Sequence, residues 1–265
     1  MKKLIVLSIL ASIGFAIGCA KVPISGRKQV NLLPESQMMG MANPAYADFL
    51  SQSNVVNASD RDAQMVKEVG EKIAVAVEKF LADNHQSERV EGFEWEFNLV
   101  NDPTVNAWCM PGGKVVFYTG ILPICQDEKG LAVVMGHEIA HAVARHGNER
   151  MSQQLIIQAG GVTLAVLMSE KPQIAQDLFL SAYGIGSQLG SLKFSRQHES
   201  ESDKLGLVFM AMAGYDPSEA PLFWERMANQ GGQQPPEFLS THPSHETRIA
   251  DLEAFMPEAM KYYAP

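Results

Sequence analysis

The stretch VVMGHEIAHAVARHGNER, residues 133–150, constrains the chain most, because it places three histidines and one glutamate within ten positions. Each residue of an α-helix advances by about 100°, so His137 and His141 lie about 40° apart on one face. Two imidazoles so placed can bind one metal ion, and Glu138 can reach a water on that metal. The sequence therefore predicts a metal-binding helix over residues 127–146.

His146 does not extend this pair of ligands. It lies five residues past His141, about 140° further round the helix. Gly147 directly after it is typical of a helix end. The third ligand must therefore come from another part of the chain.

The segment RQHESESDKLGLVFMAMAGY, residues 196–215, offers that ligand. On a helix Glu199 and Asp203 share one face, whereas Glu201 lies about 200° from Glu199 and points away. We therefore expect Glu199 to be the third ligand, Asp203 to accept a hydrogen bond from a ligating imidazole, and Glu201 to be a solvated charge. Two histidines and one glutamate with an open fourth position form a catalytic zinc set, so we expect one Zn²⁺ per chain.

Length and composition indicate a globular protein. A chain of 265 residues with 46% hydrophobic and 19% charged residues can bury one or two ordinary cores. The formal net charge is −9, and no basic patch is visible that would neutralise phosphates. We therefore expect no nucleic-acid partner.

The amino-terminal segment predicts export. Residues 1–18 combine two lysines with an apolar run that is short for a membrane span, which is typical of a signal peptide. Small residues before Cys19 resemble a bacterial lipoprotein cleavage box, so we expect Cys19 to be lipidated; an ordinary signal peptide with an incidental cysteine is the alternative. Residues 19–34 would then be a lipid-anchored extended tether and residues 35–265 the catalytic domain. The expected location is the periplasmic side of the bacterial cell envelope, at the outer membrane rather than the inner.

Periodicity predicts the other elements. Apolar residues recur at helical spacing over residues 59–83, alternate as in a strand over residues 93–99, and form a further strand over residues 114–120. The apolar residues 155–168 are too few for a membrane span and predict a buried or groove-lining helix. Cys109 and Cys125 are expected as two buried thiols, with a disulfide as the alternative.

Four motifs together resemble the HtpX and CAAX-prenyl-endopeptidase family of zinc metallopeptidases, in its secreted bacterial lipoprotein branch: NAWCMPGGKVVFYTGIL, GHEIAHAVARHGNER, ESESD and LSTHPSHETRI. The resemblance implies a compact α+β gluzincin domain, mainly helical, with a small antiparallel-edged sheet beside the helix of the His-Glu-x-x-His motif. It also implies that His137, His141 and Glu199 hold zinc, with Glu138 as general base.

The chemistry of hydrolysis suggests further roles. Zinc lowers the pKa of its bound water toward about 7, and Glu138 can take the proton as the water attacks a peptide carbonyl. The oxyanion needs another donor. The resemblance favours His242 over His245 for this donor, or for a ligand that fills the open zinc position in a resting enzyme.

Several other polar residues receive minor roles. Arg196 and Tyr118 are weaker candidates for the donor, and Arg248 is expected to anchor the last helix. His85 and His198 are expected to face solvent.

The expected activity is zinc-dependent endopeptidase cleavage of unfolded or misfolded proteins. An exposed edge at residues 114–120 would pair with an extended peptide backbone and require little sequence preference. A zinc-stabilised binding or chaperone module without turnover is a rival reading, although structural zinc sites usually use four Cys and His ligands. An exopeptidase is a third possibility, because no residue is identifiable as a binder of a free terminus.

Overall fold

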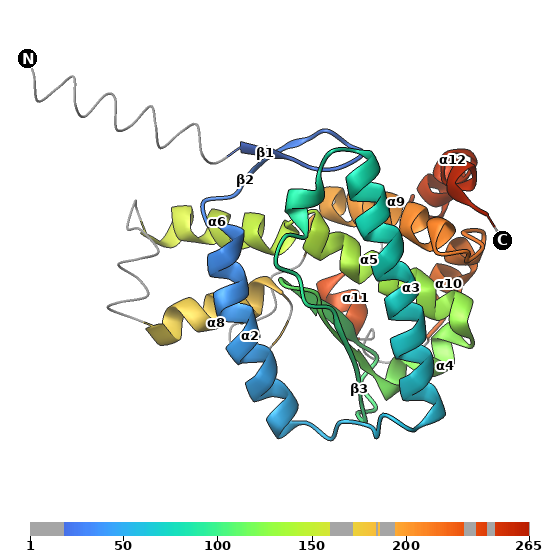
Figure 1. Cartoon of the computed structure of the whole chain (residues 1–265), viewed down its shortest axis with the longest axis horizontal. Coiled ribbons are helices and arrows are strands. Elements are labelled where there is room, and N and C mark those ends of the chain that lie inside the picture. The colour runs from blue at the N-terminus through green and yellow to red at the C-terminus, as the bar shows by residue number, and fades with distance from the viewer. Residues whose placement is uncertain are drawn as a thin grey trace, which may run out of the picture.

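The computed structural model describes residues 19–159, 172–183, 185, 194–230, 237–242 and 247–264, and it is mainly helical (Figure 1). Its strands are β1 (Cys19–Lys21), β2 (Lys28–Val30), β3 (Glu96–Val100), β4 (Ala107–Met110) and β5 (Lys114–Tyr118). Its α-helices are α2 (Glu35–Gln52), α3 (Arg61–Asp83), α4 (Leu122–Cys125), α5 (Glu128–Val143), α6 (His146–Ala159), α8 (Pro172–Ala182), α9 (Arg196–Met212), α10 (Glu219–Ala228), α11 (Glu237–Thr241) and α12 (Arg248–Ala259). The predicted α+β class, mainly helical with a small sheet, is confirmed.

The larger sheet has the strand order β3-β5-β4. β3 runs parallel to β5, with Glu96 opposite Lys114, and β4 runs antiparallel to β5, with Met110 opposite Lys114. β5 therefore lies in the middle of the sheet. The prediction that residues 114–120 form an exposed edge is wrong, because both sides of this strand are already paired within the sheet.

The two faces of this sheet belong to two different cores, as the alternation of side chains along a strand requires. Val115 and Phe117 pack into a core with α3, α5 and α9. Val116 and Trp108 pack into a second core with α2, α6 and α8. In Figure 1, α2, α6 and α8 lie on the left of the view and α3, α9 and α10 on the right. The sheet thus separates the body into two parts, and α5 lies in the first.

The long helix predicted for residues 59–83 is confirmed as α3. The Asp60 side chain caps it by accepting hydrogen bonds from Asp62 N at 2.8 Å and Ala63 N at 3.4 Å. Its predicted inward positions, such as Val69 and Ile73, are fully buried. The strand predicted from residue 93 begins only at Glu96.

Residues 19–30 are not the extended tether that the sequence predicts. β1 and β2 pair as an antiparallel hairpin with Cys19 opposite Val30. The side chains of Val22 and Gln29 are each 1% exposed, so the hairpin packs against the helical body. The extended prediction is wrong because polar partners on α6 and α9 bind this segment, and these partners are distant in sequence. Residues 1–18 lie outside the described part of the chain.

Two cysteines lie in the described part of the protein beyond β1. Cys109 and Cys125 are free and buried, which confirms the expectation of two buried thiols. Burial raises the pKa of both thiols.

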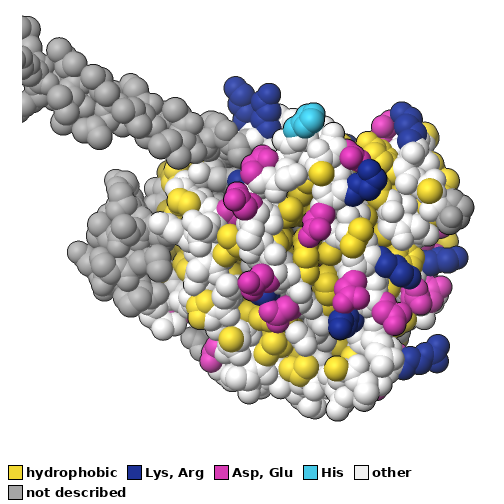
Figure 2. All heavy atoms as spheres, in the orientation of Figure 1, with side chains coloured by type: hydrophobic (Ala, Val, Ile, Leu, Met, Phe, Trp, Pro, Cys, Tyr) yellow, Lys and Arg dark blue, Asp and Glu magenta, His cyan; other side chains and the backbone are white. Residues whose placement is uncertain are grey.

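Residues 155–159 continue α6, and the rest of the apolar stretch to residue 168 lies outside the described residues. Within the described ranges, no helix has both the length and the apolar character needed to cross a membrane. The face drawn in Figure 2 mixes acidic, basic and hydrophobic side chains.

Candidate metal centre

Helix α5 presents the two predicted histidine ligands from inside the protein. It begins after Asp127, whose side chain accepts two hydrogen bonds from backbone N–H groups of the first turn, and it ends at Val143. Arg89 Nη1 donates a 2.8 Å hydrogen bond to the carbonyl of Val143 and so satisfies a free helix end. His137 and His141 are 2% and 3% exposed. The metal site is therefore enclosed in the core rather than placed on a surface loop.

The helix ends three residues earlier than the sequence predicts. Arg145 adopts a left-handed backbone conformation with φ of 60°, and α6 starts directly after it at His146. A left-handed residue terminates a helix and redirects the chain. His146 therefore leaves the direction of α5 and turns back toward His141.

Helix α9 lies against α5 through a contact of two glycines. A Cβ added to Gly136 would lie 2.9 Å from the carbonyl oxygen of Gly206, and one added to Gly206 would lie 3.0 Å from His137 N. Any larger residue at either position would push the helices apart. This close approach brings Glu199, in the first turn of α9, to the histidines of α5.

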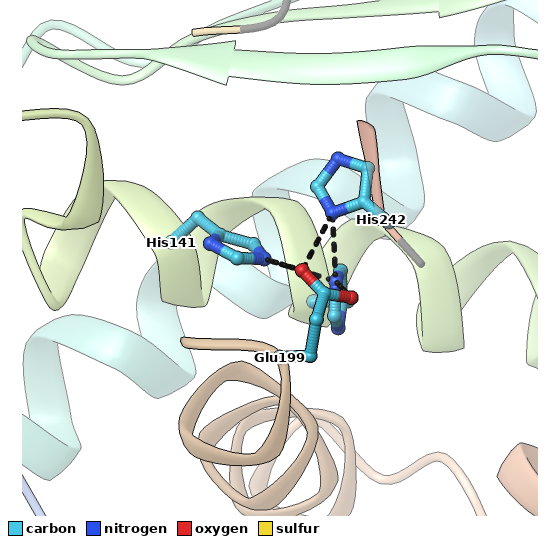
Figure 3. A group of neighbouring side chains, drawn as sticks. His141, Glu199 and His242 are labelled. Carbon is cyan, nitrogen blue, oxygen red and sulfur yellow. Dashed lines mark hydrogen bonds and ion pairs between the residues drawn. The ribbon is translucent and has the colours of Figure 1, made fainter. Parts of the chain in front are cut away.

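Four side chains meet at one point between these helices. His137, His141, Glu199 and His242 each offer one ligand atom, and these atoms all lie within 4.8 Å of one another. Nε2 of His141 lies 3.0 Å from Nε2 of His137 and 3.3 Å from Oε1 of Glu199. Nδ1 of His242 lies 3.2 Å from Oε1 of Glu199 and 3.3 Å from Nε2 of His137. Figure 3 shows His141, Glu199 and His242 converging on this point.

This donor set fits zinc. Imidazole nitrogens and a carboxylate oxygen are ligands that zinc prefers, and four of them satisfy its usual tetrahedral coordination. Glu199 is fully buried, and its Oε2 makes no hydrogen bond within the described residues. Arg248 Nη1 already faces this oxygen at 3.1 Å, so the fit to zinc rests on the four clustered donor atoms themselves.

Asp203 lies one turn after Glu199 and contacts the other side of a histidine ring. Its Oδ1 is 3.0 Å from Nδ1 of His137, so it can hold the ring with Nε2 directed at the ligand cluster. Arg248 Nη2 donates a 2.7 Å hydrogen bond to the same Oδ1. Its Nη1 lies 3.1 Å from Oε2 of Glu199, and its guanidinium stacks 3.2 Å from the ring centroid of Trp224.

Glu138 lies beside the ligand cluster without being part of it. Its side chain is 3% exposed, and Oε1 makes no hydrogen bond within the described part of the chain. Nε2 of His242 is 3.5 Å from this oxygen. Burial raises the pKa of Glu138, which moves this carboxyl toward the proton affinity that a general base at neutral pH requires.

The charges of the ligands are set by their neighbours. Burial raises the pKa of Glu199, but the facing His242 and hydrogen bonds with His137 and His141 outweigh it and hold the pKa well below its usual value. Burial lowers the pKa of His141. For His137, hydrogen bonds with Asp203 and Glu199 outweigh burial and raise the pKa to about 9. A proton and a metal ion would therefore compete at His137.

Two predicted surface residues are buried. Glu201 is 5% exposed and His198 is 4% exposed, so the predictions that Glu201 is a solvated charge and that His198 faces solvent are wrong. Glu201 does point away from Glu199, as helix geometry requires, but that direction leads to His146 and Arg27 rather than to water. His198 Nε2 lies 3.1 Å from Oε2 of Glu149.

The remaining polar residues that the sequence singles out lie away from the ligand cluster or outside the described residues. His85 is exposed, as predicted, and Arg196 is also exposed. Tyr118 is half-buried, and its hydroxyl accepts a 3.2 Å hydrogen bond from Trp108 Nε1. His245 lies outside the described residues.

Sequence reasoning missed the positions of His146 and Arg248. His146 Nδ1 lies 3.0 Å from Nδ1 of His141, and no helical periodicity indicates this, because Arg145 interrupts the helix between them. Arg248 is 1% exposed and contacts Glu199 and Asp203, whereas the sequence predicts only an anchor for α12. A buried arginine has no periodic signal, so only the tertiary contacts identify it.

Comparison with known proteins supports a peptidase. Residues 60–256, most of the chain, match the sequence profile of peptidase family M48. The chain belongs to peptidase family M48. The predicted peptidase class is thereby confirmed at the family level, and zinc as the cofactor is confirmed by the M48 match together with the four-ligand cluster.

Three relatives show how far the similarity to M48 enzymes extends. The mitochondrial metalloendopeptidase OMA1 of Schizosaccharomyces pombe is 35% identical over 240 residues, which cover 90% of this chain and 66% of that protein. The protein of the same name from Saccharomyces cerevisiae is 39% identical over 184 residues, covering 66% of this chain and 50% of that protein. The β-barrel assembly-enhancing protease of Escherichia coli is 32% identical over 163 residues, covering 59% of this chain and 33% of that protein. The chain thus spans between one third and two thirds of the length of these relatives.

The prediction of a bacterial cell-envelope location is contradicted by this comparison. The metalloendopeptidases from two yeasts, Arabidopsis thaliana and Homo sapiens that resemble this M48 chain are mitochondrial by name. The apolar run and cysteine that suggested the envelope are short, local signals, whereas the identity to these relatives extends over most of the domain.

Proposed function

We propose that this chain is a zinc-dependent endopeptidase that cleaves unfolded polypeptides. The observation that carries the proposal is the convergence of His137, His141 and Glu199 on one point, with the carboxylate of Glu138 beside it. The similarity to metalloendopeptidases supports the reaction class. Three of the four motifs that resemble the HtpX and CAAX-prenyl-endopeptidase group contribute the clustered side chains His137, His141, Glu199 and His242.

In the proposed mechanism His137, His141 and Glu199 hold the zinc. When bound, zinc would polarise the peptide carbonyl and lower the pKa of a water molecule toward about 7. Glu138 accepts the proton of the attacking water and passes it to the leaving amine. Its burial excludes bulk water from this proton transfer, and its raised pKa favours uptake of the proton.

We propose two roles for His242, because its two nitrogens face different groups. Nδ1 lies in the ligand cluster, where it can complete the zinc coordination in the absence of substrate. Nε2 faces Glu138 at 3.5 Å. If Nδ1 of His242 leaves the ligand cluster to admit a substrate carbonyl, an N–H of His242 can donate to the oxyanion that develops on that carbonyl.

We propose that an extended substrate pairs with β4, the edge strand that packs beside α5. Tyr118 N donates to Asn106 O at 3.1 Å, and the antiparallel alternation then turns the backbone groups of Ala107 and Cys109 away from β5. All four residues of β4 are buried, and Ala107 N donates to Asn106 Oδ1 at 3.0 Å. Substrate pairing therefore requires the groups that cover this edge to move aside. α11 lies at the start of this edge, since Phe238 N donates to Val105 O at 3.1 Å. Pairing through backbone groups alone requires no particular sequence, which suits unfolded segments.

Digestion of an unfolded casein by the purified chain tests this function. We expect internal cleavages that a chelator abolishes and added zinc restores, with the fragments identified by mass spectrometry. Release of terminal residues only would replace the endopeptidase by an exopeptidase, and zinc binding without any cleavage would favour a binding module.

The anchoring role of Cys19 stays a prediction from sequence. The backbone of this residue lies in β1. The mass of the amino-terminal peptide of the purified native protein tests whether the cysteine is lipidated.

A further inference from the structure

A second cluster of charged and imidazole groups lies next to the metal ligands. Glu149 and His146 come from α6, and Glu201 and His198 from α9; these four residues are at most 5% exposed. The fifth member is Arg27, from the hairpin that precedes both helices, whose side chain is 17% exposed. None of the five belongs to the proposed ligand set or to the proposed proton transfer.

Arg27 binds both carboxylates of this cluster in a bidentate way. Its Nε and Nη2 donate to Glu201 at 2.8 and 2.9 Å. Its Nη1 and Nη2 donate to Glu149 at 2.7 and 2.8 Å. Ser25 Oγ donates to Glu201 at 2.7 Å, and Gln29 Nε2 donates to Glu149 at 3.2 Å. The hairpin thus supplies every one of these donors, and a planar guanidinium is the group that can grip two carboxylates at once.

The cluster reaches the metal centre through His146. Its Nε2 lies 3.1 Å from Oε2 of Glu201, and its Nδ1 lies 3.0 Å from Nδ1 of His141. If Nε2 of His141 binds a metal, the single proton of this neutral ring must be on Nδ1, which then donates to Nδ1 of His146. The proton of His146 is consequently on Nε2 and is donated to Glu201. This assignment leaves a continuous chain of hydrogen bonds from Arg27 to the ligand. Ser202 Oγ also lies 3.3 Å from Nδ1 of His146 and is a second donor to that nitrogen.

A parallel contact reaches the second ligand-bearing helix. His198 precedes the ligand Glu199 on α9, and its Nε2 lies 3.1 Å from Oε2 of Glu149. Its ring stacks on His146 with the centroids 4.4 Å apart and the planes at 19°. The contacts through His146 and Glu201 and those through His198 and Glu149 therefore both lead to Arg27.

We propose that Arg27 is a positioning residue for the metal centre, acting through Glu201 and His146 on the ligand His141. The inference rests on the proposed function only in taking His141 as a zinc ligand. The amino-terminal hairpin becomes part of the metal site, so a partner or a cleavage that removed the hairpin would loosen the ligand set.

The physical reason is orientation and basicity. A ligating imidazole whose second nitrogen donates to an anion-linked acceptor is held in one ring orientation and is a stronger base toward the metal. Without Arg27, Glu149 and Glu201 would face each other with like charges in a buried place, and their mutual repulsion would displace His146. The hairpin has a second attachment, because Arg89 donates a hydrogen bond to the carbonyl of Lys21. Loss of the Arg27 side chain therefore does not by itself release the hairpin from the helical body.

The test measures metal affinity rather than proteolysis. Affinity for Zn²⁺ is measured by competition with a chelator in the full chain, and the cobalt(II)-loaded protein is examined by absorption spectroscopy, which reports ligand geometry. We expect His146→Leu to weaken zinc binding by about 10–100-fold and Arg27→Ala by about 10-fold. Both variants should also shift the cobalt spectrum.

Conservative variants separate positioning from folding. In His146→Asn the amide oxygen can take the place of Nδ1 as acceptor for His141, so we expect affinity above that of His146→Leu. In Arg27→Lys a single ammonium cannot hold both carboxylates, so we expect an affinity between Arg27→Ala and the parent protein. These comparisons remain informative if one of the larger changes fails to fold.

Arg226→Ala is the matched control. Arg226 is 23% exposed, against 17% for Arg27, and pairs with Glu219 at 2.6 Å on the same helix, α10. Its loss therefore removes a similarly exposed arginine, with its glutamate pair and its hydrogen bond to Ile124 O, elsewhere in the protein. We expect the parent zinc affinity and cobalt spectrum in this variant. A folded Arg27→Ala protein with the parent affinity and spectrum would overturn the inference, whereas a parent protein that binds no zinc would overturn the proposed function itself.

Discussion

Arg248 Nη2 and Asp203 Oδ1 lie 2.7 Å apart in the core, and the same oxygen holds Nδ1 of His137 at 3.0 Å. One carboxylate oxygen thus connects the carboxy-terminal helix α12 to the metal-binding helix α5. Arg248 is 1% exposed. Its positive charge is therefore balanced by the carboxylates of Asp203 and Glu199 rather than by water.

Removal of this arginine should destabilise the metal-free protein. Arg248→Leu leaves Glu199 and Asp203 as buried carboxylates without their cation, and we expect a loss of about 3–5 kcal/mol in the free energy of unfolding. Zinc should restore part of the loss, because a cation would again face Glu199. Urea unfolding of metal-free and zinc-loaded protein measures both effects. Arg226→Ala, which breaks a partly exposed pair and one hydrogen bond to Ile124 O, should cost only about 1–2 kcal/mol; equal losses in the two variants would contradict the role of Arg248.

Glu138→Gln should separate binding from catalysis. The amide is nearly isosteric and touches none of the three proposed ligands, so we expect an unchanged fold and one bound zinc. Peptide hydrolysis should fall by about 10²–10⁴-fold, the usual worth of general-base assistance. Metal analysis measures the zinc content of the variant, and digestion of an unfolded protein measures its rate of hydrolysis. Hydrolysis near the parental rate in the zinc-loaded variant would rule out the proposed mechanism.

Glu199→Ala and Glu201→Ala should differ in zinc content. The first removes a ligand, so we expect the purified protein to lose its zinc. The second removes a partner of His146, so at saturating metal it should still bind one zinc per chain. Elemental analysis after dialysis against buffer that contains saturating Zn²⁺ distinguishes them, and the reverse pattern would assign the ligand to Glu201.

His242→Ala decides between the two roles of His242. Three ligands remain, so we expect zinc to be retained. As an oxyanion donor His242 is worth about 10²-fold or more in the rate of hydrolysis, and the variant should be slower by that factor. A rate above that of the parent protein would show instead that His242 blocks the fourth position of the metal.

Acid should weaken the metal-free protein through Glu201. Burial raises its pKa, but hydrogen bonds from His146, Arg27 and Ser25 outweigh this and lower it from 4.5 to about 2. A lowered pKa in the folded state means that this contribution to stability is complete above pH 4.5 and is lost as the pH falls from 4.5 toward 2. The shift corresponds to at most about 3 kcal/mol.

Urea unfolding at about pH 6 and about pH 3 measures this dependence. Glu201→Gln serves as the comparison, because an amide does not titrate and should remove this share of the acid sensitivity. An identical dependence on pH in both proteins would show that Glu201 does not contribute.

Local sequence patterns determined much of the helical part of this protein. The four-residue spacing of His137 and His141 predicts a shared helix face, and the pairing of Glu199 with Asp203 predicts a second helix that turns both carboxylates the same way. Both predictions agree with the structure, because helix geometry fixes the direction of side chains a few residues apart. The amphipathic period of α3 was equally visible in the sequence.

Only the tertiary structure decided which of these faces meet and what covers the rest. The contact of Gly136 with Gly206 brings α5 and α9 together, and nothing in either segment alone indicates that contact. Glu201 points away from Glu199 as predicted, yet it is buried, because Arg27 and His146 arrive from segments 174 and 55 residues away. The central position of β5 and the turn at Arg145 likewise depend on partners outside the local window. Periodicity specifies the direction of a side chain, whereas burial and charge balance depend on the long-range contacts that folding brings to it.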